Sequence, residues 1–448
     1  MKKPNVILFF TDQQRWDTSS LFGNPLNLTP NYDRLAQEGT HMANCTTCQP
    51  VCGPARSCLQ TGQYATETGC VTNGIKLSEN ATTLADVFNK ADYETGYIGK
   101  WHLASHGIKG AVPKNERGGY KYWLAANVLE HESDSYDCIL YNNNNEKIKL
   151  PGYRSDAMTD AAIRYIDQQK ENPFLLCLSY LEPHHQNSID DYPAPVGFRE
   201  PYNNRWTPPD LAALGGSSQR QLPGYYGMVK RLDEALGRIY DSLKSLNILD
   251  NTILAFISDH GCHFKTRNAE YKRSCHESSI RVPCMFSGPG FESGGRRKEL
   301  FSIVDLMPTL IDAAGLEIPD SVQGSSIMPN INHACKDWRK EALIQISESH
   351  VGRSIRTHKW KYAVKAPNSK AEDGCSKEYE ESFLYDLEAD PYELENLIGI
   401  ESLSEITDKL KARLIQAMIR AGEEAPKIVS ANKRPSKQYE MSPELGEL

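Results

Sequence analysis

The chain has 448 residues, of which 39% are hydrophobic and 24% are charged. This composition is typical of a globular protein and excludes a wholly disordered chain, and the length suits one large α/β core with a smaller second domain. The net charge of −8 argues against general nucleic-acid binding, which needs a basic surface.

Apolar runs such as residues 6–10 are much shorter than the roughly 20 residues of a membrane-spanning helix. Lys2 and Lys3 are basic, but Pro4 and Asn5 follow and the apolar run stops at Thr11, so no secretory signal is recognisable. We therefore expect a cytoplasmic protein with no membrane and no nucleic-acid partner.

Short apolar runs alternate with helical patterns up to residue 315. In chain order we expect a strand at 5–10, helices at 29–39 and 82–90, a strand at 94–98, a helix at 155–170, a strand at 174–181, a helix at 225–246, a strand at 252–258 and a helix at 303–314. Thr29 and Ser155 are the expected N-caps of their helices. This alternation predicts an α/β fold, a mostly parallel sheet between two layers of helices.

Three segments depart from this pattern. Residues 137–153 are expected to form a hairpin with its turn at 142–145, and the proline-rich residues 186–223 are expected to be irregular. From residue 336, short strands at 342–347, 353–356, 359–364 and 383–386 follow one another before a helix at 405–421 and a polar tail from 422. We expect two domains, residues 1–335 and a smaller α+β domain at 336–448 that carries an antiparallel sheet.

Polar side chains follow each of the four buried strands, at the edge where open parallel sheets form their binding sites. They are Asp12 and Gln13, then Lys100 and His102, then Glu182, His184 and His185, and finally Asp259 and His260. A single polar residue at a strand end is an ordinary feature of turns, but four such ends together indicate a site.

Two of these strand ends carry donors for a divalent cation. The side-chain oxygens of Asp12, Gln13 and Asp259 favour Ca²⁺ or Mg²⁺, and the imidazole of His260 also admits Mn²⁺ or Zn²⁺. Spacing alone is equally compatible with two unrelated turns.

Residues 52–62 predict a short helix, with Pro54 in its first turn and Gly62 at its end. Cys52 would then lie at the helix N-terminus, where free N–H groups favour anions and activated thiols, and Arg56 lies one turn away. The alternative is a buried structural cysteine beside an exposed arginine.

Twelve cysteines are many for a reducing compartment, and five of them lie between residues 45 and 70. Without a recognisable signal, disulfides are the less favoured interpretation. The spacing of Cys45, Cys48 and Cys52 would suit a zinc or iron–sulfur protein, although no second Cys-x-x-Cys follows. Buried apolar cysteines are the simpler expectation.

Seven motifs, taken in the order in which they occur along the chain, resemble those of the type I sulfatases of the alkaline phosphatase superfamily. Cys52-x-Pro54-x-Arg56 with Leu59-x-Thr61-Gly62 is similar to the family signature. The other motifs lie at residues 4–14, 99–102, 182–184, 258–261, 271–283 and 384–393. The resemblance covers nearly the whole chain and implies the alkaline-phosphatase-like sandwich with a smaller carboxy-terminal sheet.

The resemblance also implies a mechanism. Cys52 would be converted to formylglycine by a maturation enzyme, and one divalent ion, Ca²⁺ with Mg²⁺ or Mn²⁺ as alternatives, would bind Asp12, Gln13, Asp259 and His260. Further roles are implied for five side chains: Lys100 and Lys272 neutralise the sulfate, His184 protonates the departing alcohol, His102 holds or deprotonates residue 52, and Arg56 orients it. The expected function is a sulfuric ester hydrolase acting on a sulfated carbohydrate or another small sulfate ester.

The chain departs from the family pattern at three places. Gln13 stands where many members carry Asp, His260 stands where others carry Asn, and residues 185–187 differ from the common His-x-Pro. The first two departures keep a phosphonate or phosphate ester hydrolase as the alternative function. His350, Arg353 and residues 186–223 are candidate specificity elements, with plain surface covering as the other interpretation.

Overall fold

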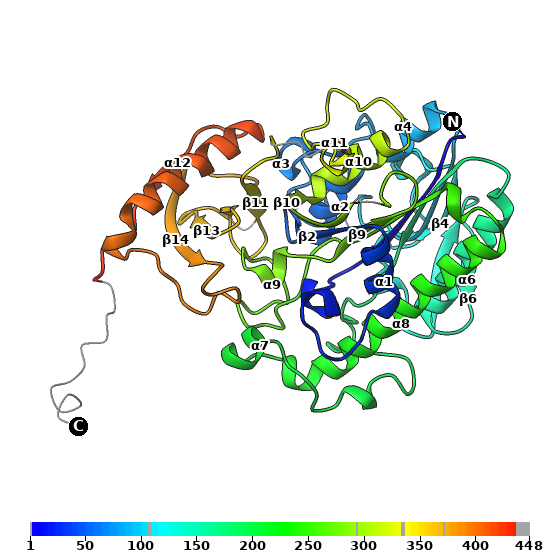
Figure 1. Cartoon of the computed structure of the whole chain (residues 1–448), viewed down its shortest axis with the longest axis horizontal. Helices are drawn as coiled ribbons and strands as arrows, with labels where there is room; N and C mark the ends of the chain where they lie inside the picture. The colour runs from blue at the N-terminus through cyan, green and yellow to red at the C-terminus, as the bar shows by residue number, and fades with distance from the viewer. Residues whose placement is uncertain (1, 106–108, 293, 333–336, 371, 436–448) are drawn as a thin grey trace.

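The computed structural model describes residues 2–105, 109–292, 294–332, 337–370 and 372–435. Two β-sheets organise these residues, the larger in the amino-terminal three quarters and the smaller in the carboxy-terminal part (Figure 1). The expected domain boundary at residues 335/336 and the tail beyond residue 435 lie outside the described residues.

The larger sheet contains ten strands in the order β10-β2-β9-β8-β1-β7-β3-β4-β5-β6. Their bounds in chain order are β1 Asn5–Thr11, β2 Thr40–Thr46, β3 Glu94–Lys100, β4 Tyr122–Ala126, β5 Cys138–Asn142, β6 Lys147–Leu150, β7 Phe174–Ser179, β8 Thr252–Ser258, β9 Cys284–Ser287 and β10 Gly295–Ser302. β9 and β5 run antiparallel to their neighbours, whereas β8, β1, β7, β3 and β4 are parallel. The mostly parallel sheet expected from the sequence is therefore present, with two reversed strands among the others.

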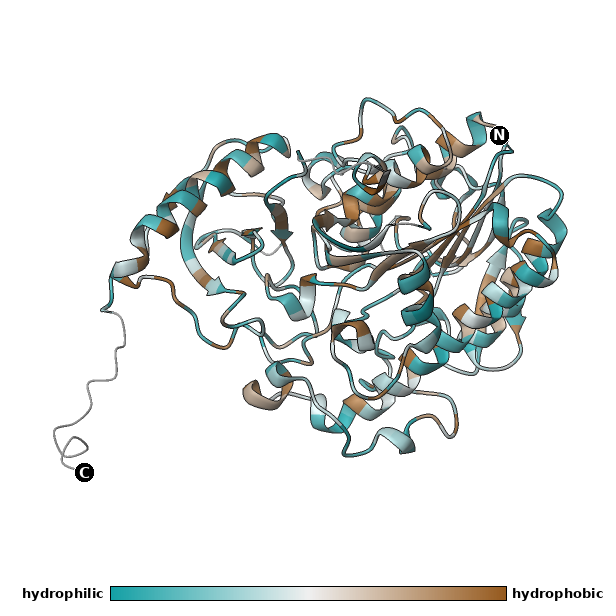
Figure 2. Ribbon diagram, in the orientation of Figure 1, coloured by the Kyte–Doolittle hydropathy of each residue, from teal (hydrophilic) through white to brown (hydrophobic). Residues whose placement is uncertain are grey.

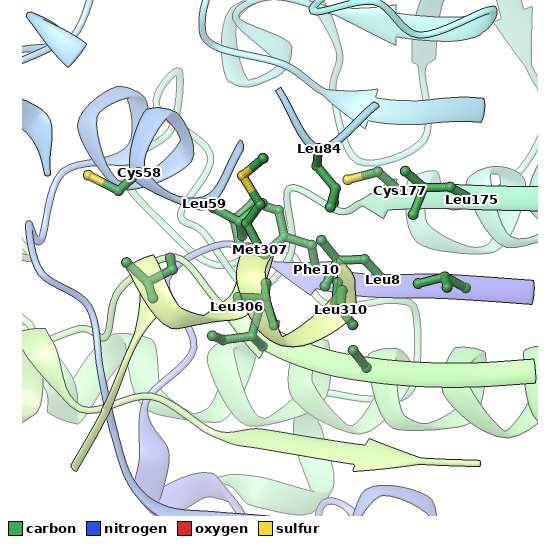
Figure 3. Packing of buried hydrophobic residues seen from close by; sticks show 14 of the residues in the cluster. Leu8, Phe10, Cys58, Leu59, Leu84, Leu175, Cys177, Leu306, Met307 and Leu310 are labelled. Carbon is green, nitrogen blue, oxygen red and sulfur yellow. The ribbon is translucent and has the colours of Figure 1, made fainter. Parts of the chain in front are cut away.

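Helices cover both faces of this sheet, because alternate residues of its central strands are apolar on both sides. Leu8 and Phe10 pack against α2 (Cys52–Thr61), α4 (Leu84–Lys90) and α10 (Leu306–Ala313), as Figure 3 shows. Ile7 and Phe9 instead face α1 (Pro30–Glu38), α6 (Arg154–Gln169) and α8 (Ser218–Ser245). Figure 2 shows the resulting pattern, with brown strands at the centre and teal outer helix surfaces.

Shorter helices complete this part of the chain: α3 Ala65–Thr68, α5 Leu129–Glu132, α7 Pro209–Leu214, α9 Glu277–Ile280 and α11 Met328–Asn332. The hairpin expected at 137–153 is formed by β5 and β6. All the cysteines that the structure describes are free, and all but Cys375 are buried. Within the described residues, no helix combines the length and the apolar character that crossing a membrane requires.

The smaller sheet has the order β11-β12-β13-β14-β15, with bounds Ala342–Ile346, Gly352–Arg356, Trp360–Lys365, Glu378–Asp386 and Lys427–Val429. The first four strands are antiparallel, as expected. β15 pairs parallel to β14 and lies within the segment that we expected to be a polar tail. The last helix, α12 (Ser404–Arg420), packs its Leu410, Leu414 and Met418 on this sheet.

The start of α8 and the N-cap of α6 differ from the sequence prediction. α8 begins at Ser218 and runs through Pro223, because Leu222, Tyr225 and Tyr226 bury an apolar face that outweighs the one hydrogen bond proline cannot donate. α6 begins at Arg154 with Tyr153 as its N-cap, and the Ser155 hydroxyl makes no cap hydrogen bond. Strands β2, β4, β9 and β10 were not predicted.

Candidate active site

Four neighbouring strands bring the expected polar residues together at one edge of the sheet. β8, β1, β7 and β3 are consecutive and parallel, so their carboxyl ends meet. The Asp12 backbone N–H donates to the Glu182 carbonyl at 3.2 Å, and that of Asp259 donates to the Thr11 carbonyl at 3.2 Å. These bonds fix the residues that follow β1, β7 and β8 with respect to one another.

Cys52 is the first residue of α2 and lies at the centre of this edge. The helix ends as predicted, with Gly62 at φ +66° donating its N–H to the Cys58 carbonyl. The Cys52 Sγ accepts a hydrogen bond from Lys272 Nζ at 2.7 Å, and it lies 3.2 Å from His260 Nε2 and 3.6 Å from Asp12 Oδ1. The interpretation of an inert structural cysteine does not fit these contacts.

The surroundings of Cys52 favour an ionised or otherwise polar side chain at this position. Burial raises the pKa of the thiol, but Lys100, Lys272 and His260 outweigh burial and hold the pKa well below its usual range. This polarity makes position 52 the place where a nucleophile would act.

Arg56 is buried one turn along α2, contrary to the alternative that would expose it. Its Nη1 donates to the Lys100 carbonyl and to Ser179 Oγ, both at 2.7 Å. Its Nη2 donates to Asp12 Oδ2 at 3.0 Å and to Asp259 Oδ2 at 3.4 Å. The guanidinium thereby joins α2 to the ends of β1, β3, β7 and β8.

Asp12, Cys52, Asp259 and His260 offer ligand atoms that lie within 4.8 Å of one another. His260 Nδ1 lies 2.9 Å from the Gly261 carbonyl, which only accepts, so Nδ1 carries a hydrogen and Nε2 is the ring nitrogen that faces the cluster. Gly261 is required here, because a Cβ atom would lie 2.2 Å from the Ser278 carbonyl oxygen. The backbone after β8 thus aims Nε2 of this imidazole at the two carboxylates.

Gln13 completes the expected ligand set with an amide oxygen. Its Nε2 donates to Tyr192 Oη at 3.0 Å and to Cys262 Sγ at 3.2 Å, which orients the amide. Its buried Oε1 has no hydrogen-bond partner. A buried acceptor without a partner is costly, and a bound cation would satisfy it.

The two carboxylates also indicate a missing positive charge. Burial raises the pKa of Asp259 to about 6, and the neighbouring charge of Asp12 adds to this rise. Asp12 itself is kept ionised because Lys100 and Arg56 outweigh its burial. Two carboxylates, an amide oxygen and one imidazole suit Ca²⁺, Mg²⁺ or Mn²⁺, so the residues fit the expected divalent ion.

Cys45 and Cys48 lie outside this cluster. Cys48 is a neighbour of Cys58 and Cys45 is a neighbour of Cys284, and burial raises the pKa of both thiols far above the usual range. Among the residues that the structure describes, these cysteines therefore form no zinc or iron–sulfur site with Cys52.

Two buried lysines lie on either side of Cys52. Lys100 Nζ donates to Asp12 Oδ2 at 2.8 Å and lies 3.2 Å from Glu130 Oε1. Lys272 Nζ lies 3.0 Å from His260 Nε2 and 3.3 Å from His184 Nε2. Lys272 also lines the cavity above Cys52, and a buried ammonium group in a cavity wall can bind an anion.

His184 follows β7 and faces the same cavity. Its Nδ1–H donates to the His185 carbonyl at 2.6 Å, so its Nε2 is the atom that points to Lys272. Burial and the Lys272 charge both lower the pKa of His184. His185 lies behind it, with its ring between His184 and Tyr271 at 4.3 Å from each ring centre.

Glu130 is a site residue that the sequence reasoning missed. It lies in α5, just beyond β4, and its Oε1 is 3.7 Å from His102 Nδ1. Burial raises the pKa of Glu130, but Lys100 and His102 lower it by a larger amount, so the pKa is about 2. Had β4 been recognised, the search for polar residues after strands would have reached this position.

A cavity of about 360 Å³ opens over these groups and is lined by Cys52, His102, Glu130, His184, Lys272 and several asparagines. Two expected specificity residues are not brought to it. Arg353 is buried in the smaller sheet, where its Nε donates to Glu423 at 2.8 Å. His350 is absent from the lining and lies beside Ser349, whose hydroxyl donates to the carbonyl of Arg273, a residue of the cavity wall.

Comparison with known proteins adds sequence and structural similarity to this geometry. Residues 4–316 match the family profile described as Sulfatase, and residues 269–420 match that described as N-sulphoglucosamine sulphohydrolase, C-terminal. The chain is 30% identical to an ulvan-active sulfatase of Formosa agariphila, over 94% of this chain and 82% of that protein.

Two further relatives extend the comparison. An N-acetylglucosamine-6-O-sulfatase of Bacteroides thetaiotaomicron is 26% identical, with 89% of this chain and 83% of that protein covered. A crystal structure of a candidate sulfatase from Bacteroides fragilis superposes with a TM-score of 0.82 at 26% identity, over 94% of this chain and 97% of that one.

Proposed function

The chain belongs to the sulfatase family, with the alkaline-phosphatase-like fold, and is a sulfuric ester hydrolase; from that premise we propose how its own residues hydrolyse a sulfated sugar. The observation that carries the proposal is the cluster around Cys52, in which two lysines, two histidines and a cation site surround one side chain at the base of a cavity.

Position 52 supplies the nucleophile. The motif Cys52-x-Pro54-x-Arg56 supports conversion of this cysteine to formylglycine by a maturation enzyme, and formylglycine, once hydrated, supplies a hydroxyl group that can attack sulfur. Gly53 donates its N–H to Asn73 Oδ1 at 2.8 Å and Arg56 ties the same helix to two carboxylates, so residue 52 has a fixed backbone. Fixed geometry is what an in-line displacement at sulfur requires.

The charges around residue 52 suit a sulfate ester. Lys100 and Lys272 hold the sulfate oxygens and stabilise the negative charge that develops on them. Asp12, Gln13, Asp259 and His260 would hold a divalent ion, Ca²⁺ with Mg²⁺ or Mn²⁺ as alternatives, which would polarise the sulfate and the side chain at position 52.

The two histidines move protons at opposite ends of the reaction. His184 Nε2 faces the cavity, and a bound sulfate offsets the Lys272 charge that otherwise disfavours its protonated form. His184 then donates a proton to the departing sugar oxygen, and His102 takes a proton from the side chain at position 52.

The cavity offers a sugar several hydrogen-bonding side chains. The lining includes the polar side chains of Asn73, Asn127 and Asn187, together with His131, which can hydrogen-bond to hydroxyl groups. The ulvan-active and N-acetylglucosamine-6-O relatives act on sulfated carbohydrates, as their names state. We therefore assign a sulfated carbohydrate as the substrate class.

The test compares turnover on sulfated mono- and disaccharides with turnover on phosphonate and phosphate esters. The protein is produced together with a maturation enzyme, and mass spectrometry of the tryptic peptide 35–56 measures the conversion of Cys52. We expect an aldehyde at position 52, the highest kcat/KM on a sulfated sugar, and no activity in Cys52→Ala.

Two results would contradict the proposal. Full activity in a sample whose Cys52 is entirely unmodified would exclude formylglycine. A higher kcat/KM for phosphonate or phosphate esters than for every sulfated sugar would identify the alternative hydrolase on the same scaffold.

A further inference from the structure

Glu130 is a buried carboxylate that the proposed reaction leaves without a role. Its side chain is 6% exposed, and its Oε2 has no hydrogen-bond partner. His102 Nδ1, which lies 3.7 Å from Glu130 Oε1, is likewise buried and without a hydrogen-bond partner. Two neighbouring side chains that each leave a buried polar atom unpaired are costly and point to a functional contact.

The backbone of His102 is fixed independently of its ring. Its N–H donates to the Asn127 carbonyl at 2.9 Å, and its φ of +62° lies in the left-handed region. A non-glycine residue keeps that conformation only where its surroundings hold it. The rotation and protonation of the imidazole are therefore left to the side chains around it, and the ring reaches the Cys52 thiol.

We propose that Glu130 is a positioning residue, which accepts a hydrogen bond from His102 Nδ1–H and so leaves Nε2 of that ring free to take a proton from residue 52. The proposal rests on the proposed function in one respect, the role of His102. The 3.7 Å separation is longer than a hydrogen bond, and such contacts in catalytic sites shorten when substrate binds.

Glu130 also restricts Lys100. An ammonium group has three hydrogens; here one is donated to Asp12 and one points to Glu130, which leaves the third for a sulfate oxygen. Glu130 can thus act through His102 or only through the charge of Lys100, and the experiment must separate these two routes.

The short helix α5, which carries Glu130, is held firmly enough to position a side chain. Gln186 Nε2 donates to the Glu130 carbonyl at 3.1 Å, and Arg154 Nη1 donates to Gln186 Oε1 at 3.2 Å. Arg154 also donates to Glu182 at 2.8 Å, just before His184. Gln186, in the segment where the chain departs from the family's His-x-Pro, therefore joins the loop of His184 to α5.

The first measurement determines the tautomer of His102 by long-range ¹H–¹⁵N NMR of the full chain labelled with ¹⁵N-histidine. His102→Ala identifies the His102 signals by their absence. We expect the Nδ1–H tautomer in the wild type and a shift to the Nε2–H tautomer in Glu130→Gln, because the amide oxygen accepts more weakly than a carboxylate and the amide N–H₂ can donate to Nδ1. Asp134→Asn, the same change at an exposed site on the same loop, should leave the tautomer unchanged.

The tautomer is read without turnover, so the result stands apart from the proposed sulfatase chemistry. The tautomer of His102 in the wild-type protein tests the proposal even if the variants are unstable. An Nε2–H tautomer in the wild type, or an unchanged tautomer in a folded Glu130→Gln, overturns the proposal.

The second measurement is a double-mutant cycle on a sulfate ester. Glu130→Gln should lower kcat about 10²-fold, with KM changed by about twofold or less, because a misoriented base loses its share of the rate. In the His102→Ala background the same substitution should cost less than about threefold. If Glu130→Gln lowers kcat by the same factor with and without His102, the effect acts through Lys100, and the proposed positioning of His102 is overturned.

Discussion

The imidazole of His184 faces a cavity in which the leaving alcohol would lie, and the choice of substrate tests its role. A sugar alkoxide needs a proton as the S–O bond breaks, whereas nitrophenolate departs almost unaided. His184→Ala should therefore lower kcat/KM about 10²–10⁴-fold on a sugar sulfate and much less on nitrophenyl sulfate. Similar losses on both substrates would mean that His184 only binds substrate.

The carboxylate of Asp259 tests the cation site. Asp259→Asn removes a charged donor beside Asp12 and should lower the affinity for the divalent ion at least about tenfold. Elemental analysis of the purified protein measures the stoichiometry and identifies the ion. Thermal unfolding with added Ca²⁺ gives a second readout, since a bound ion raises Tm.

Asp233→Asn serves as the control for this experiment, because it alters a buried carboxylate far from the ligands in sequence and outside the cluster. Its metal content should equal that of the wild type. One ion per chain in Asp259→Asn, with unchanged affinity, would show that the assigned ligands are wrong.

At the level of elements, α8 caps α1 through one side chain. Asp233 accepts hydrogen bonds from the backbone N–H groups of Asn31 and Tyr32, at 3.0 and 2.8 Å, in the first turn of α1. Burial raises its pKa to about 6, although these two donors oppose the rise. The native state therefore binds this proton more tightly than the unfolded chain does.

Because the pKa of Asp233 is higher in the native state than in the unfolded chain, the free energy of unfolding depends on pH. The contribution of protonated Asp233 to the free energy of unfolding is present at low pH and is lost as pH rises through about 6. Urea unfolding of wild type and Asp233→Asn should show that the wild type loses on the order of 1–3 kcal/mol relative to the variant between about pH 4 and pH 7. A constant difference across this range would contradict the assignment.

At the level of the whole molecule, a buried ion-pair network joins the two sheets. Lys361 of β13 lies 2.8 Å from Glu277 of α9 and 2.6 Å from Glu393, and Arg356 of β12 lies 3.1 Å from Glu277. All four side chains are buried. The smaller sheet is thereby tied to the segment that follows Lys272.

Lys361→Met should destabilise the protein by roughly 3–5 kcal/mol, because it leaves two buried carboxylates without their shared cation. Lys409→Met, which removes an exposed pair with Glu405, is the matched control and should change stability by less than about 1 kcal/mol. Chemical denaturation measures both. A Lys361→Met variant as stable as the control would exclude an energetic role for the network.

Local patterns in the sequence were sufficient for several features. The apolar runs of β1, β3, β7 and β8, the proline and glycine of α2, and the polar residues at the strand ends all depend on neighbours within one or two turns. Sequence motifs alone also led to the sulfatase family, which the family profile and the relatives confirm. The roles given to the individual site residues stay predictions.

Tertiary structure decided what local patterns cannot encode. The order β8-β1-β7-β3 brings residues about 250 positions apart within hydrogen-bonding distance, as with Gln13 and Asp259. Glu130 enters the site only because β4 extends the sheet beyond β3, and Arg353 is directed to Glu423 by the strand that carries it. The period of a strand follows from adjacent residues, whereas the cap of α1 and the partner of a buried charge depend on which distant segment packs beside them.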